Sequence, residues 1–285
     1  MKILLTGASG QVGYELQRSL QALGQVVALD RARMDLSDLD QVRDVIRRER
    51  PKLIVNPAAY TAVDQAETQA ALAWRVNADA PAVMAAEAKL LGAAMVQYST
   101  DYVFDGAAAR PWRETDPTGP LNVYGASKLA GEQAVAAAGI AHLILRTSWL
   151  YGMRGKNFLL TMLRLAAERP ALRVVADQHG APTWSRTVAD STALLLCQAR
   201  AGGPAWWARH GGVYHLSCRG QTTWCGFTEA IVAAAGLECR VLPITSAEYP
   251  VPAKRPQYSV MSSERLMARF CHLPDWKEAL HLCMG

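Results

Sequence analysis

The chain opens with MKILLTGASGQVGYELQRSL, residues 1–20, and this stretch decides the fold class. A short apolar strand stops at Gly7, and an amphipathic helical pattern begins after Gly10. With Gly13 these residues give the spacing GxxGxxG, in which glycines allow a tight turn, backbone contact with a pyrophosphate and close packing of helix on strand. The helix N-terminus would supply N–H groups to phosphate oxygens. The stretch predicts a dinucleotide-binding strand–loop–helix unit, with a purely structural turn as the alternative.

Strand and helix patterns alternate five times within the first 150 residues. This alternation predicts a doubly wound parallel α/β sheet of the Rossmann type, in which a helical stretch from Asp64 to Leu91 breaks at Pro81. Beyond Gly152 the pattern loosens into glycine- and proline-rich loops between shorter elements. We therefore expect a dinucleotide-binding domain over residues 1–152 and a smaller substrate-binding lobe over 153–285, with some elements returning to the Rossmann core. The expected strands are 2–5, 25–30, 51–56, 93–99, 141–149, 171–177 and 211–217.

The second expected strand, QVVALD, ends at Asp30. A carboxylate at this place accepts hydrogen bonds from the adenosine ribose and favours NAD. Arg31 and Arg33 follow directly, and either guanidinium could hold the 2′-phosphate of NADP. The sequence therefore leaves NADPH and NADH both open as the cofactor.

A possible proton-transfer site lies between residues 97 and 128. Tyr124 and Lys128 are four residues apart in a helical pattern, so at about 1.5 Å per residue they share one face, about 6 Å apart along the axis. Thr100 ends an apolar strand, at the carboxyl edge of the sheet where ligands bind. We expect the lysine to lower the tyrosine pKa from about 10, which would make the phenol a better acid. A surface helix that merely carries both side chains is the alternative.

Composition excludes several classes of protein. The 285 residues are 51% hydrophobic and 19% charged, and the net charge of +5 is scattered, which does not indicate nucleic-acid binding. No apolar run reaches the roughly 18 residues of a membrane span, and the chain enters a strand without a signal peptide, so we expect a cytoplasmic protein. The six cysteines begin at Cys197 and contain no CxxC. Reduced, buried thiols are the favoured interpretation over a metal site at His215, Cys218 and Cys225.

Seven motifs, in order along essentially the whole chain, resemble the extended short-chain dehydrogenase/reductase family. They are TGASGQVG, NPAAYTAVDQAE, YSTDYVFDG, PLNVYGASKLAGE, RTSWLYG, QHGAPT and AKRPQYS. The resemblance implies NAD(P)H-dependent reduction of the C4 keto group of a dTDP-linked 6-deoxyhexose. It is closest to the reductases of nucleotide-sugar synthesis for cell-surface polysaccharides.

The resemblance also assigns residues. Tyr124 would protonate the C4 oxygen, Lys128 would lower its pKa and hold the nicotinamide ribose, and Thr100 would orient the substrate. Trp149 is expected at the sugar, with a core aromatic as the alternative, and Arg255 at the diphosphate, with a solvated arginine as the alternative. The expected cofactor-binding residues are Gly7, Gly10, Gln11, Val12, Gly13, Asp30, Asp35, Leu36, Ala58, Ala59, Tyr60, Tyr124 and Lys128; the expected substrate-binding residues are Thr100, Asp101, Trp149 and Arg255.

Two other functions are open at this point. The first is a nucleotide-sugar epimerase or dehydratase on the same fold. Dehydratases usually place an Asp-Glu pair after the threonine, whereas here Asp101-Tyr102 follows Thr100, which speaks against a dehydratase. A non-enzymatic relative resembling the regulatory subunit of methionine adenosyltransferase would bind cofactor without turnover. The tryptophan of RTSWLYG favours the reductase.

Some reductases that this chain resembles are dimers bridged by Mg²⁺ between carboxylates. Glu15 matches one ligand, but the second position holds Arg186, and the third would lie past Gly285. Because Mg²⁺ prefers carboxylate and water oxygens, one carboxylate beside a guanidinium makes a poor site. We predict no bound metal, a pairing of Arg186 with Glu15 of its own or a neighbouring subunit, and a monomer or homodimer.

Overall fold

Six parallel strands form the central sheet of the computed structural model, which describes residues 1–285. Their order is β10-β5-β4-β3-β1-β2, so the chain starts in the interior of the sheet and winds outward in both directions. The predicted doubly wound sheet is confirmed. The strands are β1 (Lys2–Leu5), β2 (Gln25–Ala28), β3 (Leu53–Asn56), β4 (Ala94–Thr100), β5 (His142–Thr147) and β10 (Gly212–His215).

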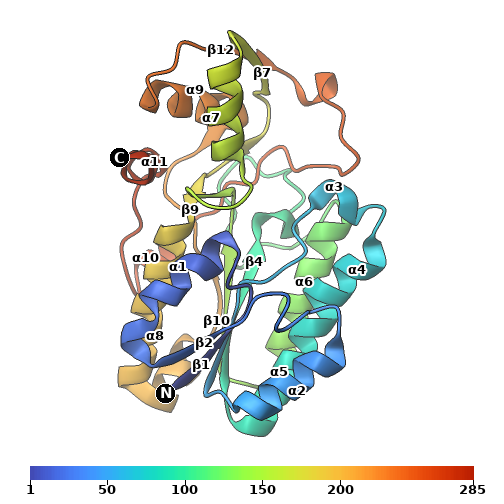
Figure 1. Cartoon of the computed structure of the whole chain (residues 1–285), viewed down its shortest axis with the longest axis vertical. Helices are drawn as coiled ribbons and strands as arrows, with labels where there is room; N and C mark the ends of the chain where they lie inside the picture. The colour runs from blue at the N-terminus through green and yellow to red at the C-terminus, as the bar shows by residue number, and fades with distance from the viewer.

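Both faces of this sheet are covered by helices, as Figure 1 shows. On one face Ile3 and Leu5 pack among side chains of α1 (Gln11–Ser19) and α8 (Ser185–His210). On the other face Leu4 packs among side chains of α2 (Leu39–Glu49), α5 (Ala80–Leu91) and α6 (Val123–Ala137). Successive strand residues point to opposite faces, so burial of both faces explains why these strands are apolar without alternation.

The helical stretch after β3 differs from the prediction. α3 (Val63–Ala66) ends early, and α4 (Ala70–Trp74) then runs through a π-helical turn, η2 (Arg75–Asp79), directly into α5. The predicted break at Pro81 is wrong, because Pro81 lies in the first turn of α5, where its missing N–H costs little. The wide turn before it, closed by Ala80 N–H to Arg75 O, takes up the change in register.

A second, smaller unit lies above the sheet in Figure 1. β7 (Ala171–Val175) pairs in parallel with β12 (Arg240–Ile244), a strand that the sequence did not predict. α7 (Phe158–Glu168), α9 (Trp224–Ala234) and α11 (Trp276–Met284) share one apolar core with this strand pair. The remaining elements are β6 (Leu150–Tyr151) with β9 (Thr183–Trp184), β8 (His179–Gly180) with β11 (Thr222–Thr223), α10 (Glu264–Met267), and the 3₁₀ turns η1 (Gln21–Leu23), η3 (Asp101–Val103) and η4 (Ser246–Glu248).

Between β7 and α9 of the smaller unit, the chain returns to the central sheet through α8 and β10. α8 packs along α1, and β10 pairs with β5 to extend the sheet. The sequence pattern predicts a helix from Thr187 to Arg200, but α8 continues as far as His210, with a kink where Gly203 (φ 58°) precedes Pro204. The boundary at residue 152 stays a prediction.

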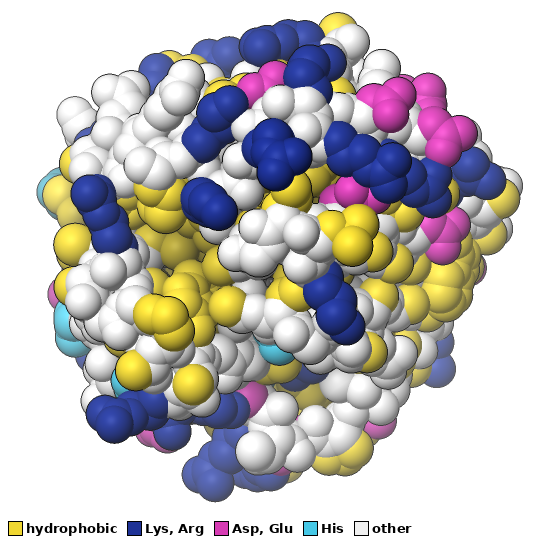
Figure 2. All heavy atoms as spheres, turned by 90° about the horizontal axis from the view of Figure 1, so that it is seen from below, with side chains coloured by type: hydrophobic (Ala, Val, Ile, Leu, Met, Phe, Trp, Pro, Cys, Tyr) yellow, Lys and Arg dark blue, Asp and Glu magenta, His cyan; other side chains and the backbone are white.

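The lower face of the molecule, turned toward the viewer in Figure 2, carries Lys and Arg side chains dispersed among acidic and apolar ones. None of the helices combines the length and the apolarity that crossing a membrane requires.

Candidate active site and cofactor groove

The glycine loop between β1 and α1 is shaped so that an anion can reach the helix N-terminus. Gly7 has φ +57°, and its carbonyl accepts the N–H of Gly10 at 2.9 Å. A Cβ at Gly13 would lie 2.1 Å from the Gly7 carbonyl oxygen, so no side chain fits there. The cap residue of α1, Gly10, has no side chain to occupy the first N–H groups of the helix.

A groove of about 460 Å³ runs from this loop across the carboxyl ends of the strands. Its lining contains Gly7, Gly10, Gln11, Val12, Gly13, Asp35, Leu36, Ala58, Ala59 and Tyr60 of the residues predicted to bind cofactor. The glycine cradle and the small side chains after β3 leave the backbone open to a flat, extended ligand. The groove therefore fits a dinucleotide.

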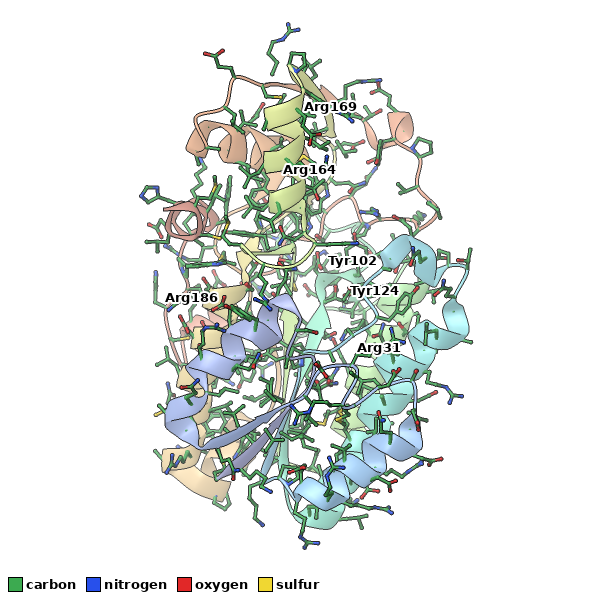
Figure 3. The ribbon with its side chains drawn as sticks, viewed as in Figure 1. Arg31, Tyr102, Tyr124, Arg164, Arg169 and Arg186 are labelled. Atoms are coloured by element: carbon green, nitrogen blue, oxygen red, sulfur yellow. The ribbon has the colours of Figure 1, made fainter.

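The two arginines after β2 point in different directions. Arg31 lines the groove, and its Nε donates to Asp35 at 3.2 Å (Figure 3). Arg33 turns away and donates to the carbonyl of Ala28 at 3.1 Å. Asp30 does not line the groove, because its carboxylate accepts the Arg33 N–H at 3.1 Å, so its contact with a ribose stays a prediction.

Asn77, which the sequence did not single out, fixes the middle of the groove. Its side chain accepts the Tyr60 N–H at 2.8 Å and donates to the Tyr60 carbonyl and to Ser127, each at 3.1 Å. Asn77 lies in the π-helical turn and is 1% exposed. Asn77 ties the loop after β3 to α6. The π-helical turn that holds it is often found at functional sites, but no local sequence pattern indicated this turn.

The predicted catalytic residues meet at the end of β4. Asn122 caps α6 by accepting the Gly125 N–H at 2.8 Å. A Cβ at Gly125 would lie 2.2 Å from the Tyr102 carbonyl oxygen, so only glycine lets α6 pack this close to the turn after β4. This approach brings the Tyr124 phenol next to the Thr100 hydroxyl.

The charges at this site do not follow the sequence prediction. Burial raises the Tyr124 pKa to about 12; the neighbouring Thr100 hydroxyl opposes the rise, and the Asp101 charge adds to it. Burial lowers the Lys128 pKa to about 8, against the opposing charge of Glu132. The expected lowering of the Tyr124 pKa is wrong for the ligand-free chain, because desolvation dominates and the Lys128 Nζ donates to the Tyr98 carbonyl at 2.6 Å instead.

That carbonyl ends a buried line of hydrogen bonds across three strands. Thr6, directly before the glycine loop, donates to Asn56 at 2.5 Å, and Asn56 donates to Gln97 at 2.8 Å. Gln97 then donates to the Tyr98 carbonyl at 3.1 Å, beside Lys128. A satisfied polar line of this kind connects the loop of the groove to the lysine and holds both in place.

Asp101 carries an unmatched oxygen at the same edge. Its Oδ1 accepts the Thr100 hydroxyl at 3.1 Å, whereas its Oδ2 is buried and has no partner. Burial raises the Asp101 pKa to about 6, and the neighbouring hydroxyls of Ser259 and Thr100 oppose this rise. An orphaned buried carboxylate oxygen is costly, which indicates a place for a donor on a ligand.

A larger cavity of about 810 Å³ lies between the catalytic edge and the upper unit. Most of its lining is apolar and comes from α7, β7 and neighbouring segments, with Arg255 and Asp64 joined across it at 2.8 Å. Tyr102 connects the two places: its ring centroid is 5.6 Å from that of Tyr124, and the Arg255 charge opposes the rise that burial causes in its pKa (Figure 3). The sequence indicated only Arg255; the apolar lining has no local signal.

Trp149 lies beside this cavity and stacks on Trp224, a lining residue, with ring centroids 3.5 Å apart. Its partial burial leaves part of the indole accessible. The predicted contact of Trp149 with a sugar stays a prediction.

The residues considered for metal do not converge. Arg186 lies 3.6 Å from Asp190, its neighbour one turn along α8, so within this chain the expected pairing with Glu15 is wrong. Asp190 also accepts the Ser19 hydroxyl at 2.5 Å. No three His, Cys, Asp or Glu side chains are grouped in a way that could hold a metal ion, and all six cysteines are free thiols.

A glycine-cradled groove, with a tyrosine and lysine one helical turn apart beside a threonine at the strand edge, defines a nicotinamide-dependent oxidoreductase of the extended short-chain dehydrogenase/reductase class. The family model described as RmlD substrate binding domain matches residues 1–285. The chain belongs to this family, whose curated members include dTDP-4-dehydrorhamnose reductases, and the predicted resemblance is confirmed.

Individual relatives are similar over their full length. The dTDP-4-dehydrorhamnose reductase of Burkholderia thailandensis is 53% identical over 296 residues, covering 100% of this chain and 98% of that protein. A crystal structure of a dTDP-4-dehydrorhamnose reductase from Clostridium acetobutylicum has a TM-score of 0.92 at 38% identity, covering 100% of this chain and 98% of that one. The enzyme from Bacillus anthracis, solved in complex with NADP, has a TM-score of 0.90 at 37% identity, covering 99% and 98%.

Proposed function

We propose that this chain reduces the C4 keto group of dTDP-4-dehydro-L-rhamnose to give dTDP-L-rhamnose, with NADPH or NADH as the reductant. Family membership supports the reaction, and the NADP complex of the Bacillus anthracis relative supports the cofactor. The observation that carries the proposal is that Thr100, which ends β4, lies together with Tyr124 and Lys128 of α6 at the carboxyl edge of the sheet.

The groove would hold the nicotinamide cofactor. Its pyrophosphate would rest on Gly10, Gln11 and Val12, where Gln11 and Val12 offer backbone N–H groups, and the small residues Ala58 and Ala59 leave room for it over the sheet. The bound cofactor supplies a hydride to the C4 carbon. Lys128, whose Nζ donates to the Tyr98 carbonyl in the ligand-free chain, would hold the nicotinamide ribose.

Tyr124 would hold the proton that the C4 oxygen takes up. With a pKa of about 12 its Oη keeps that proton at neutral pH, and Thr100 fixes its direction. Donation becomes efficient when the pKa approaches the working pH, and moving it from about 12 to about 7 corresponds to roughly 7 kcal/mol. A swing of the Lys128 ammonium from the Tyr98 carbonyl toward the phenolate would supply part of this stabilisation.

The larger cavity would hold the dTDP part of the substrate. Its apolar walls suit a base and a deoxyribose, and the Arg255 guanidinium suits a diphosphate. The cavity residues lie mostly beyond residue 152, which supports a cofactor domain over 1–152 and a substrate lobe over 153–285. Asp101, with its orphaned oxygen, would accept a sugar hydroxyl.

A monomer or homodimer in the cytoplasm completes the proposal. Six free thiols suit a reducing compartment. The curated relatives are named as reductases, which supports turnover rather than a regulatory cofactor-binding subunit or a dehydratase.

The test of this proposal removes the phenol oxygen of Tyr124. Tyr124→Phe should lower kcat with the dTDP-4-keto sugar at least about 100-fold and leave the Kd for NADPH within about twofold, because the lost group acts on the reacting proton. Tyr14→Phe on α1 is the matched control and should keep kcat. Near-normal turnover in Tyr124→Phe would remove the phenol from the proton step, and no turnover by the unaltered chain would refute the reaction.

A further inference from the structure

Trp149 has a backbone conformation that a bulky residue rarely adopts. Its φ is +44°, and Arg50 is the only other non-glycine residue with positive φ. Such a conformation persists only where the surroundings hold it, and it is common at ligand sites. Trp149 stands two residues after Thr147, which pairs in the sheet with the catalytic residue Thr100.

Two segments far apart in the chain, around Gly180 and at Trp224, hold Trp149 in place. The ring of Trp224 lies parallel to it, with the centroids 3.5 Å apart and the planes 4° apart. Trp224 is itself fixed by a hydrogen bond from its Nε1 to Gln178 at 3.2 Å. The Trp149 carbonyl accepts the Thr183 N–H at 3.2 Å, which anchors the strained backbone.

Gly180 makes the other close contact with the Trp149 indole. A Cβ at this position would lie 2.2 Å from Cε2 of Trp149 and 2.5 Å from its Nε1, so any side chain at residue 180 displaces the indole. The φ of Gly180 is not positive, so its backbone conformation does not require glycine. The glycine of QHGAPT is needed instead because the Trp149 indole occupies the space of a side chain.

We propose that Gly180 and Trp224 are positioning residues that hold Trp149 as a rigid wall for the sugar of the substrate. The aromatic pair spans the distance from the catalytic edge, where Trp149 begins, to the large cavity, which Trp224 lines. Trp224 covers one face of the indole and Gly180 lies against the other, so the indole offers its edge to the sugar. The inference rests on the proposed function and adds which residues set the sugar specificity of that site.

The expected consequence is specific to the sugar. If the clamp is removed, the backbone of Trp149 relaxes toward negative φ and the indole leaves its place. Trp224→Leu should therefore raise the KM for the dTDP-4-keto sugar at least tenfold, as Trp149→Ala does. The Kd for NADPH should stay within about twofold, because neither tryptophan lines the cofactor groove.

A double-mutant cycle separates positioning from direct contact. If Trp224 acts through Trp149, the variant with both Trp149→Ala and Trp224→Leu binds the sugar no worse than Trp149→Ala alone. Effects that multiply instead would show that Trp224 contacts the substrate independently and would overturn the proposal. An unchanged KM in Trp149→Ala would also overturn the positioning proposal. The proposed reaction would still stand in that case, provided that the variant turns over the substrate.

Gly180→Ala tests the same clamp from the opposite side. It should reproduce the rise in KM and remove the near-UV circular dichroism of the stacked indoles, as Trp224→Leu does. Gly202→Ala is the matched control, because its Cβ would lie 2.8 Å from the Cβ of Trp206, which is outside the groove and the cavity. A normal KM in Gly180→Ala with the dichroism lost would refute the role of the clamp. Absence of turnover in the unaltered chain would refute the proposed function itself and this inference with it.

Discussion

Replacing Asp101 by asparagine should stabilise this protein at neutral pH and have no such effect near pH 4. Asp101 is 2% exposed, its Oδ2 has no partner, and burial raises its pKa from 3.8 to about 6. The folded chain therefore binds this proton more tightly than the unfolded chain. The stabilising contribution is complete below about pH 4 and is lost as the pH rises through about 6.

The size of the effect follows from the same values. A pKa difference of about 2 corresponds to about 3 kcal/mol in the free energy of unfolding. For 285 residues the entropy of unfolding is about 0.6 kcal/mol per kelvin, so Asp101→Asn should raise Tm by about 5 °C at pH 7.5 relative to the unaltered chain. An asparagine retains an Oδ1 that can accept the Thr100 hydroxyl.

The assay is calorimetric unfolding of both proteins from pH 4 to pH 8, without cofactor or substrate. Asp116→Asn is a control of opposite sign: a hydrogen bond from Arg110 lowers the Asp116 pKa, so this variant should lose stability at neutral pH and recover it as the pH falls. A difference in Tm between Asp101→Asn and the unaltered chain that stays constant across this range would refute the account of a strained, ionised Asp101.

Three further outcomes are expected. Arg31→Ala should weaken NADPH binding several-fold more than NADH binding, whereas Arg33→Ala should weaken both equally or not at all, because only Arg31 lines the groove; isothermal titration with each cofactor would measure this. Arg255→Met should raise the KM for the dTDP-sugar at least tenfold, with exposed Lys254→Met as the control, since Arg255 lines the cavity and its Nε lacks a partner; equal KM values in the two variants would contradict a diphosphate contact. Activity should survive dialysis against EDTA, and a loss that Mg²⁺ restores would show that the departure at Arg186 does not abolish the metal site.

Local patterns determined the framework of this protein and indicated the residues proposed for its reaction. The glycine spacing after β1 and the apolar runs of β1 to β5 predicted the sheet, because a buried parallel strand and a phosphate loop each impose their own composition on a few consecutive residues. Tyr124 and Lys128 were recognisable for the same reason, since one helical turn fixes their relation.

Tertiary structure alone decided what depends on distant segments. The Tyr124 pKa rises because burial, which no local spacing reveals, outweighs the lysine one turn away. Arg31 and Arg33 differ only in direction, and that is set by Asp35 and the Ala28 carbonyl. The clamp on Trp149 joins residues 149, 180 and 224, three positions that only packing brings together. A sequence specifies short-range geometry directly, whereas desolvation and side-chain direction arise from the sum of contacts that folding creates.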